Sequence, residues 1–461
     1  MPGSERAAPS RIWWPLLAAV AAALLFNRWV LDSAHFFFAD DWGWLERAHF
    51  FPWHQTIHLF PNALYNDRPV GELVIRGLYQ VFWLRHGAWN QVWWCLHAVN
   101  VALLVLLARP WLPPFRLALA GVLAACWFST LAAVHWVGAV FDLLGATLVL
   151  GTLLAYQHAV LSSQRRWFWL AMSVLLHLAA IRTKEFALGM VAVLAIWEVL
   201  LLRRSGWKAS CLRLSPHIVL AVVFAWRYLL LYQQQGDGMQ GSAYGLSLTA
   251  SGLLEGVGWY FAQAFYAFIP GSNETHVGIG LAFAAGVLVV ACCSRVGIVA
   301  LLSAAALMAA VLLLGNQRHP LYLYVPHFLI VIALCSAFPR QRMVDVATFA
   351  LAALLLVWPA HSGFLRDARN FTLIKGQYSK TLFYDYATAM QHGKPVSPVT
   401  IAVVETYFDP FSWGSGDALR LYHDDRSIQV QVIALKPNED PCENAAGSCF
   451  VERQGHLVRV R

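Results

Sequence analysis

The chain contains 461 residues, of which 59% are hydrophobic and only 13% are charged. A soluble domain is typically about 25% charged, so this composition excludes an ordinary water-soluble protein. Apolar runs of roughly the 20 residues that a helix needs to cross a membrane recur along nearly the whole chain. We therefore predict a polytopic α-helical membrane protein with about eleven transmembrane helices and a small C-terminal extracytoplasmic α/β domain.

The formal net charge of +8 could indicate a nucleic-acid partner or an anionic surface, but its distribution favours membrane topology instead. Most Arg and Lys residues between the predicted helices fall in alternate connections, for example Arg109 and Arg116. The intervening short connections hold only Arg182, Lys184 and Arg318. This asymmetry follows the positive-inside rule and predicts a cytoplasmic N-terminus and an external C-terminal domain. We expect no nucleic-acid partner, and the compact loops suit a bacterial inner membrane.

In chain order, the predicted spans lie near residues 12–31, 89–108, 117–131, 140–159, 167–181, 186–202, 216–232, 278–292, 296–314, 321–338 and 344–360. A further apolar and aromatic stretch, 253–269, contains Glu255 and Gln263. We expect a re-entrant or interfacial helix there, although another span would also fit. In the second span, His97 and Asn100 share one face, which favours hydrogen bonds between helices.

The membrane module is predicted to cover residues 1–361, and it includes one long external segment, residues 32–87. This segment is too polar to cross the membrane, yet it is rich in aromatic residues. Trp and Tyr are enriched at the level of the lipid headgroups. We therefore predict short amphipathic helices that lie at the membrane surface.

The tail, residues 362–461, has a different composition. Apolar and polar residues alternate at 399–405 and 427–433, a period typical of half-buried strands. Cys442 and Cys449 are close together in this tail, where they can form a local disulfide. The tail is thus predicted to be the external α/β domain.

Two adjacent carboxylates, Asp40 and Asp41, follow the first predicted helix in the sequence Phe-Ala-Asp-Asp-Trp. Like charges and an apolar setting both raise a carboxyl pKa, and such a carboxylate can act as a general base on a hydroxyl. The pair therefore predicts a catalytic site on the outer face. The alternative is a solvated acidic turn near a helix end.

Cationic side chains are predicted on the same face of the membrane. Arg68 suits bidentate contact with phosphate oxygens, although it could instead pair with Asp67 or with lipid headgroups. Near the end of the membrane module, Arg318 is followed by Tyr322. We predict that these residues help to bind an anionic phosphate.

Two further external connections carry polar residues. His135 and Asp142 lie in one of them, while Arg182, Lys184 and Glu185 lie in a very short loop. Charges so close to a helix bundle are costly unless they have a partner or a function. We predict that Arg182 and Lys184 bind phosphate, and that His135, Asp142 and Glu185 orient the site or the acceptor. Structural salt bridges from Lys184 to Glu185 or from Arg182 to Asp142 are the alternative.

The order of these motifs resembles the GT-C integral-membrane glycosyltransferases, particularly the protein O-mannosyltransferase and lipid A aminoarabinose transferase branches. Those families place an acidic pair after the first helix, as Asp40 and Asp41 stand here. The similarity covers roughly residues 12–340, and each motif is weak alone while the ordered set is fairly specific. The other matching stretches are Tyr65-Asn-Asp-Arg68-Pro69-Val70, Leu96-His97-Ala-Val-Asn100-Val-Ala-Leu-Leu104, His135-Trp-Val-Gly-Ala-Val-Phe-Asp142-Leu-Leu144, Thr183-Lys184-Glu185 (with Thr where some members have Ser) and Arg318 with its tyrosines.

The resemblance implies a polyprenyl- or dolichyl-phosphate sugar as donor, but it names neither the sugar nor the acceptor, which could be a glycan, a lipid or a protein. The tail carries no mark of the family. We expect an inverting sugar transfer with Asp40 or Asp41 as base. The residues indicate no required cofactor or metal, although a pair of acids leaves a divalent metal possible. The competing interpretation is a non-enzymatic transporter or assembly factor for lipid-linked glycans.

Overall fold

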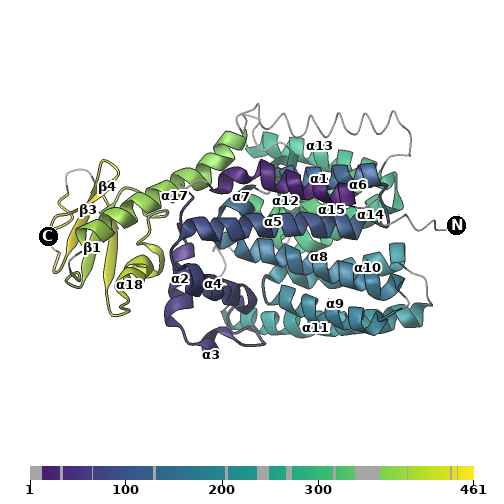
Figure 1. Cartoon of the computed structure of the whole chain (residues 1–461), viewed down its shortest axis with the longest axis horizontal. Coiled ribbons are helices and arrows are strands. Elements are labelled where there is room, and N and C mark those ends of the chain that lie inside the picture. The colour runs from purple at the N-terminus through teal and green to yellow at the C-terminus, as the bar shows by residue number, and fades with distance from the viewer. Residues whose placement is uncertain are drawn as a thin grey trace.

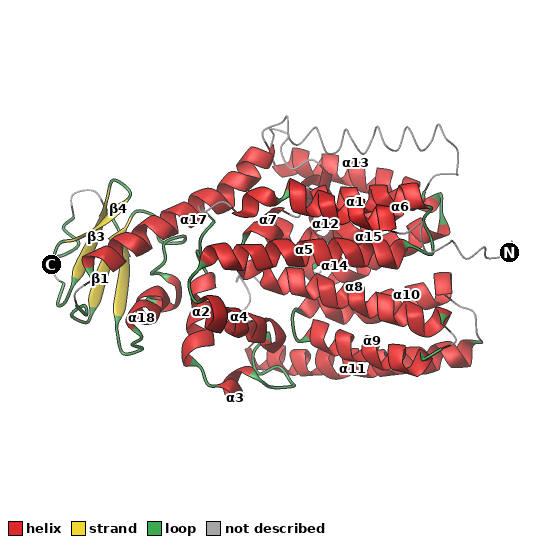
Figure 2. Cartoon of the chain, viewed as in Figure 1, coloured by secondary structure: helices red, strands yellow, loops and turns green. Residues whose placement is uncertain are grey.

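The computed structural model describes residues 13–31, 35–64, 66–127, 131–162, 164–202, 206–235, 249–265, 273–314, 318–337, 364–391, 393–436, 439–443 and 445–461. The helices of the membrane module form one bundle, and the strands lie beyond one end of it (Figures 1 and 2). The helices are α1 (Trp13–Phe26), η2 (Arg28–Leu31), α2 (Asp41–Phe50), α3 (Trp53–Thr56), α4 (Pro69–Phe82), α5 (His86–Ala108), α6 (Pro114–Cys126), α7 (Leu131–His135), η4 (Val137–Ala139), α8 (Val140–Leu161), α9 (Arg166–Ile181), η5 (Glu185–Gly189), α10 (Met190–Trp197), η6 (Glu198–Leu202), α11 (Trp207–Gln235), α12 (Ala250–Phe265), α13 (Asn273–Cys292), α14 (Arg295–Leu312), η8 (Pro320–Leu323), α15 (Tyr324–Ser336), α17 (Phe364–Ala389), η9 (Trp413–Ser415) and α18 (Asp417–His423).

The apolar helices identify a multi-pass membrane protein. Within the described ranges, 5 helical stretches are long and apolar enough to cross a membrane, and shorter apolar helices such as α1, α6 and α9 pack among them. The class predicted from the sequence is therefore confirmed. The count of about eleven spans stays a prediction, and the span expected at 344–360 lies outside the described residues.

The stretch expected to be re-entrant or interfacial forms α12, which packs side by side with α13. Gly258 and Gly280 allow the two backbones to meet, because a Cβ added to Gly280 would lie 1.7 Å from the Gly258 carbonyl oxygen. Small residues of this kind let membrane helices approach closely. With 16 residues, α12 is shorter than the roughly 20 of a full crossing, and the choice between an interfacial helix and a span stays open.

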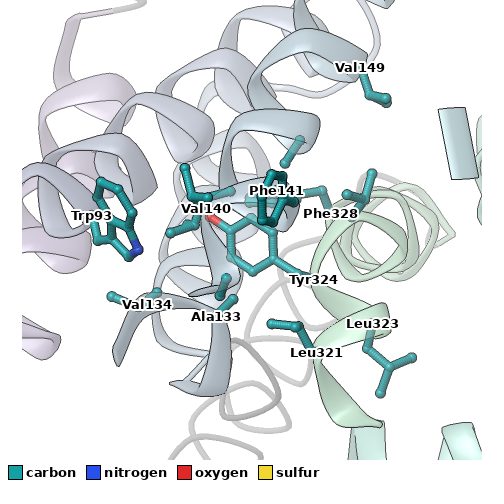
Figure 3. Packing of buried hydrophobic residues seen from close by; sticks show 14 of the residues in the cluster. Trp93, Ala133, Val134, Val140, Phe141, Val149, Leu321, Leu323, Tyr324 and Phe328 are labelled. Carbon is teal, nitrogen blue, oxygen red and sulfur yellow. The ribbon is translucent and has the colours of Figure 1, made fainter. Parts of the chain in front are cut away.

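One part of the buried core lies where α8 packs against α15 and α5 (Figure 3). Tyr324 is fully buried there among Phe141, Val140 and Phe328. His97 Nδ1 lies 2.8 Å from the Tyr324 hydroxyl oxygen, and the Asn100 amide donates to that oxygen at 3.1 Å and to the Leu143 carbonyl oxygen at 2.9 Å. The predicted hydrogen bonds between helices are confirmed.

Within its described residues, the segment at 32–87 that was predicted to be external forms three short helices, α2, α3 and α4, at the end of the bundle that faces the tail (Figure 1). Helix α4 is amphipathic: it buries Ile75 and Tyr79 and exposes Gln80. Helices therefore form where the sequence predicted them.

The tail folds into a four-stranded sheet with α17 and α18 beside it (Figure 2). The strands are β1 (Val399–Val403), β2 (Val430–Ala434), β3 (Cys449–Arg453) and β4 (His456–Arg459), in the order β2-β1-β3-β4. The central strand β1 is parallel to β2 and β3, and β4 is antiparallel to β3. The two strands predicted from alternation are β1 and β2, and the disulfide between Cys442 and Cys449 is formed.

The tail is docked onto α2. The indole of Trp42 stacks on Phe383 of α17, with ring centroids 4.9 Å apart, and its Nε1 donates to Ser379 Oγ at 3.4 Å. On the other side of the contact, Arg426 lies 3.3 Å from Glu46. Because α2 begins at Asp41, the tail holds the helix that carries the acidic pair.

Candidate functional site

The two carboxylates of the acidic pair have different surroundings. Ala39 has a φ of +53°, which is uncommon for a residue with a Cβ, and it turns the chain just before the pair. Asp41 is buried, and its Oδ2 accepts a hydrogen bond from the Phe38 N–H at 3.0 Å. Asp40 is half-buried, and its Oδ1 has no hydrogen-bond partner among the described residues. The Oδ1 atom of Asp41 likewise has no hydrogen-bond partner among the described residues, so the two carboxylates differ in burial and in the bond from Phe38 to Asp41.

A cavity of about 390 Å³ lies between this turn, the ends of several membrane helices and the tail. Two carboxylates, Asp40 and Asp142, and two cations, Arg68 and Lys184, line it together with aromatic side chains. The remaining lining residues are Phe38, Ala39, Asn66, Trp136, Gly138, His319, Leu321, Tyr322, Tyr407, Phe408 and Trp413. Opposite charges and aromatic rings thus share one enclosed space.

Both cations of the cavity are held by ion pairs. Lys184 Nζ donates to the two Asp142 oxygens at 2.5 and 2.6 Å. Arg68 donates to both Glu185 oxygens at 3.2 Å, and its guanidinium lies 5.1 Å from the Phe141 ring centroid. The alternative pairs considered from the sequence, Lys184 with Glu185 and Arg68 with Asp67, are wrong, because Lys184 pairs with Asp142 and Arg68 pairs with Glu185.

The titration of the acidic pair follows from its position. Burial raises the pKa of Asp40 to about 6, although the nearby Arg68 charge partly opposes this. Burial also raises the pKa of Asp41 well above its usual value, and the charge of Asp40 adds to the effect. A carboxyl whose pKa lies near neutrality can exist in both protonation states at physiological pH, as a proton acceptor requires.

The other residues proposed from sequence lie around the cavity rather than in its lining, apart from Tyr322, whose ring centroid is 4.9 Å from Lys184 Nζ. Arg182 is buried and pairs with Asp67 at 2.9 Å, not with Asp142. Arg318 pairs with Glu255 at 2.5 Å, and His135 is buried with its ring centroid 5.3 Å from that of His35. Glu185 does not line the cavity, but it accepts hydrogen bonds from Arg68, which does.

The tail supplies three lining residues that sequence reasoning missed: Tyr407, Phe408 and Trp413. They belong to the segment after β1, Tyr-Phe-Asp-Pro-Phe-Ser-Trp, whose density of aromatic residues is unusual in an otherwise polar tail. That density of aromatic residues is the sequence feature that could have indicated a contribution of the tail to the site. Asn66, Trp136 and His319 were also missed as lining residues, although each adjoins a motif residue.

No family model and no curated protein matches the sequence, but solved structures resemble the fold. The archaeal oligosaccharyltransferase AglB from Archaeoglobus fulgidus, in complex with an inhibitory peptide and a dolichol-phosphate, superposes with a TM-score of 0.51 at 13% identity, over 90% of this chain and 64% of that chain. ArnT from Cupriavidus metallidurans in the apo state superposes with a TM-score of 0.51 at 14% identity, over 94% and 87%. Both are GT-C glycosyltransferases.

The chain has the GT-C fold. This confirms the fold that the ordered motifs implied. The chain spans 64% of the length of the oligosaccharyltransferase, so the likeness concerns the shared fold and not the whole of that protein. The residues that line the cavity belong in part to the tail and to the turn before α2, which lie at the same end of the bundle (Figure 1).

The cavity combines the carboxylate of Asp40 with two cations that are held by ion pairs. Arg68 and Lys184 present N–H donors of the kind that bind phosphate oxygens. Within the described ranges, no three His, Cys, Asp or Glu side chains come together as they would around a metal ion. That the site works without a metal stays a prediction.

Proposed function

We propose that this protein is a glycosyltransferase that moves a sugar from a polyprenyl-phosphate carrier to a hydroxyl acceptor on the outer face of a bacterial inner membrane, with inversion. One observation carries the proposal: Asp40, Arg68 and Lys184 line the same cavity. A base and a phosphate site must lie within one substrate's length of each other for an in-line displacement. The GT-C fold supports the donor class, because AglB of this fold was solved with a dolichol-phosphate.

In the proposed reaction, Asp40 takes the proton of the acceptor hydroxyl. The acceptor oxygen forms a bond to the anomeric carbon as the bond from that carbon to the phosphate oxygen breaks, and the electron pair leaves with the polyprenyl phosphate. The leaving phosphate gains one negative charge, which Arg68 and Lys184 are placed to stabilise. Fixed charges of this kind are usually the largest contribution to catalysis.

Asp41 has a different part in this proposal. Its Oδ2 is occupied by the Phe38 N–H, and a Cβ added to Gly138 would lie 2.7 Å from its Oδ1. The side chain is therefore packed against the backbone on both sides. We assign Asp40 as the base and Asp41 as the residue that holds the turn in shape.

The test uses radiolabelled polyprenyl-phosphate sugars with membranes that contain the wild type, Asp40→Asn or Asp41→Asn. Trp167→Ala, an exposed position at the far end of α9, is the control for expression and general damage. Turnover of one donor that Asp40→Asn abolishes and Trp167→Ala retains would support the proposal. Unchanged turnover in both Asn variants would remove the acidic pair from the chemistry.

The second candidate function is a transporter or assembly factor for lipid-linked glycans. It predicts donor binding without turnover and release of intact donor on the opposite side of the membrane. The position of the charged residues does not favour a transport path across the membrane, because those that line the cavity lie at one end of the bundle, beside the tail. Detection of intact labelled donor in the opposite compartment of proteoliposomes would favour this candidate.

A further inference from the structure

The tail contributes three aromatic rings to the cavity, one exposed and two half-buried. Tyr407, Phe408 and Trp413, here called the aromatic platform, follow β1 and line the same space as Asp40. Phe408 reaches the acidic turn, because its ring centroid lies 6.2 Å from that of Phe38. The side chain of Tyr407 is nevertheless 57% exposed. Large aromatic rings that line a cavity, one of them well exposed, suggest a surface for binding a ligand.

The aromatic platform is held rigidly by its own segment. Asp409 is fully buried and accepts hydrogen bonds from the backbone N–H groups of Phe411 and Ser412 at 2.7 and 2.9 Å. The indole N–H of Trp413 donates to the Tyr407 carbonyl oxygen at 3.0 Å, and the two rings lie 5.7 Å apart. A binding surface that is fixed before its ligand arrives loses less entropy on binding.

The platform is also fixed to the rest of the tail. The Lys375 ammonium of α17 lies 4.0 Å from the Phe408 ring centroid, a cation–π contact.

Burial raises the pKa of the Tyr407 phenol, and the charge of Asp40 adds to this, so the phenol keeps its proton at neutral pH. Tyr407 therefore offers both a ring face and a hydroxyl donor close to the carboxylate.

We infer that the aromatic platform binds the acceptor and that the acceptor is a saccharide. This inference rests on the proposed transfer to a hydroxyl. A sugar ring has apolar C–H faces that pack on aromatic rings and a rim of hydroxyls that need polar partners. The same cavity supplies such partners in Asn66 and His319. A pyranose on the platform would present a hydroxyl toward Asp40, whereas an acyl chain would leave these polar groups unpaired.

The experiment separates acceptor binding from donor chemistry. Purified protein is given one radiolabelled polyprenyl-phosphate sugar that it turns over, and slow hydrolysis of the donor is measured without acceptor. A panel of methyl glycosides and short oligosaccharides is then added, in parallel with serine-containing and threonine-containing peptides and with a glycerolipid. The variants are Trp413→Ala, Tyr407→Ala and the conservative Trp413→Phe, with Trp167→Ala as the control of equal size.

We expect a saccharide to become labelled and to accelerate donor consumption. Trp413→Ala and Tyr407→Ala should raise the KM for that saccharide by about tenfold or more, as loss of a stacking contact of roughly 1.4 kcal/mol would, whereas Trp167→Ala should leave this KM unchanged. Trp413→Phe should recover most of the loss. A kcat effect without a KM effect would show a merely structural role and would overturn the inference.

Labelling of the peptide or the glycerolipid, or hydrolysis that no saccharide accelerates, would also overturn the saccharide acceptor while the transferase proposal stands. Loss of hydrolysis in Asp40→Asn alone tests that proposal separately. If the wild type neither hydrolysed nor transferred any donor, the transferase proposal would fail, and the saccharide acceptor with it. Donor hydrolysis without labelling of a saccharide would overturn the saccharide acceptor alone, so the two failures are distinguishable.

Discussion

Trp42 and Phe383, which are far apart in the sequence, stack with their planes 26° apart and their centroids 4.9 Å apart. Trp42 is the second residue of α2, directly after the acidic pair, and it is fully buried. The contact therefore joins the tail to the proposed catalytic turn. Most of the following predictions concern how the fold maintains that turn.

Replacement of Phe383 with alanine should destabilise the protein by about 3–5 kcal/mol, as removal of a buried aromatic side chain usually does. The effect should appear as a lower Tm of the purified protein in detergent. Transfer should fall as well, because Trp42 would lose the surface that fixes the start of α2. Phe168→Ala, at an exposed position of α9, should change neither quantity, and an unchanged Tm in Phe383→Ala would contradict the docking role.

The transfer rate should rise with pH through about 6 and then level off, because Asp40 acts in its ionised form and burial raises its pKa to about 6. The raised pKa of Asp40 also determines how the stability of the fold changes with pH. A carboxyl whose pKa is higher in the folded state than its usual 3.8 binds protons more tightly when folded, so its contribution to stability falls as pH rises from about 4 to about 6.

Asp40→Asn should therefore raise the Tm at pH 7.5 while it lowers kcat by roughly 10²–10⁴-fold, the usual contribution of a general base. Thermal unfolding and turnover measured on the same preparations would check both halves. A variant that lost activity and also lost stability would argue that Asp40 is structural.

Lys184→Met should be severely destabilising, because it leaves the buried carboxylate of Asp142 without its cation. Breaking such a pair typically costs about 3–5 kcal/mol. The double variant Lys184→Met with Asp142→Asn should recover much of the Tm, since no buried charge is then unpaired. Transfer should stay low in the double variant, and recovery of activity would exclude Lys184 as a phosphate ligand.

Arg182→Gln should reduce the yield of folded protein while the folded fraction keeps the donor KM of wild type. The reason is that Arg182 donates to Asp67 at 2.9 Å in a buried position and does not line the cavity. Donor titrations on protein purified by size exclusion would measure this. An increase in donor KM would instead support the phosphate-binding role that the sequence suggested.

The sequence predicts this fold well where physical patterns are local. Apolar length identifies the membrane class, and alternation identifies β1 and β2. It also places Asp40, Arg68 and Lys184 on one face, because each follows or precedes a predicted span. All three line the cavity.

Partners of the charged groups could not be predicted in the same way. Arg182 and Lys184 are two residues apart, yet they pair with acids in different parts of the fold, Asp67 in the loop before α4 and Asp142 in α8. Such choices depend on the direction of each side chain at the end of α9. The contact between Phe38 and Phe408 depends on how the tail docks, and no short-range pattern encodes it.

The stacking of Trp42 on Phe383 also sets an order of events during synthesis. A ribosome releases the acidic turn long before it makes Phe383, so the nascent protein carries the turn without its support. The turn can reach its final shape only after α17 has been translated and brought to the same side of the membrane. A chain that ends before α17 would therefore have the acidic turn without the ring stack and the hydrogen bond that Trp42 makes to this helix.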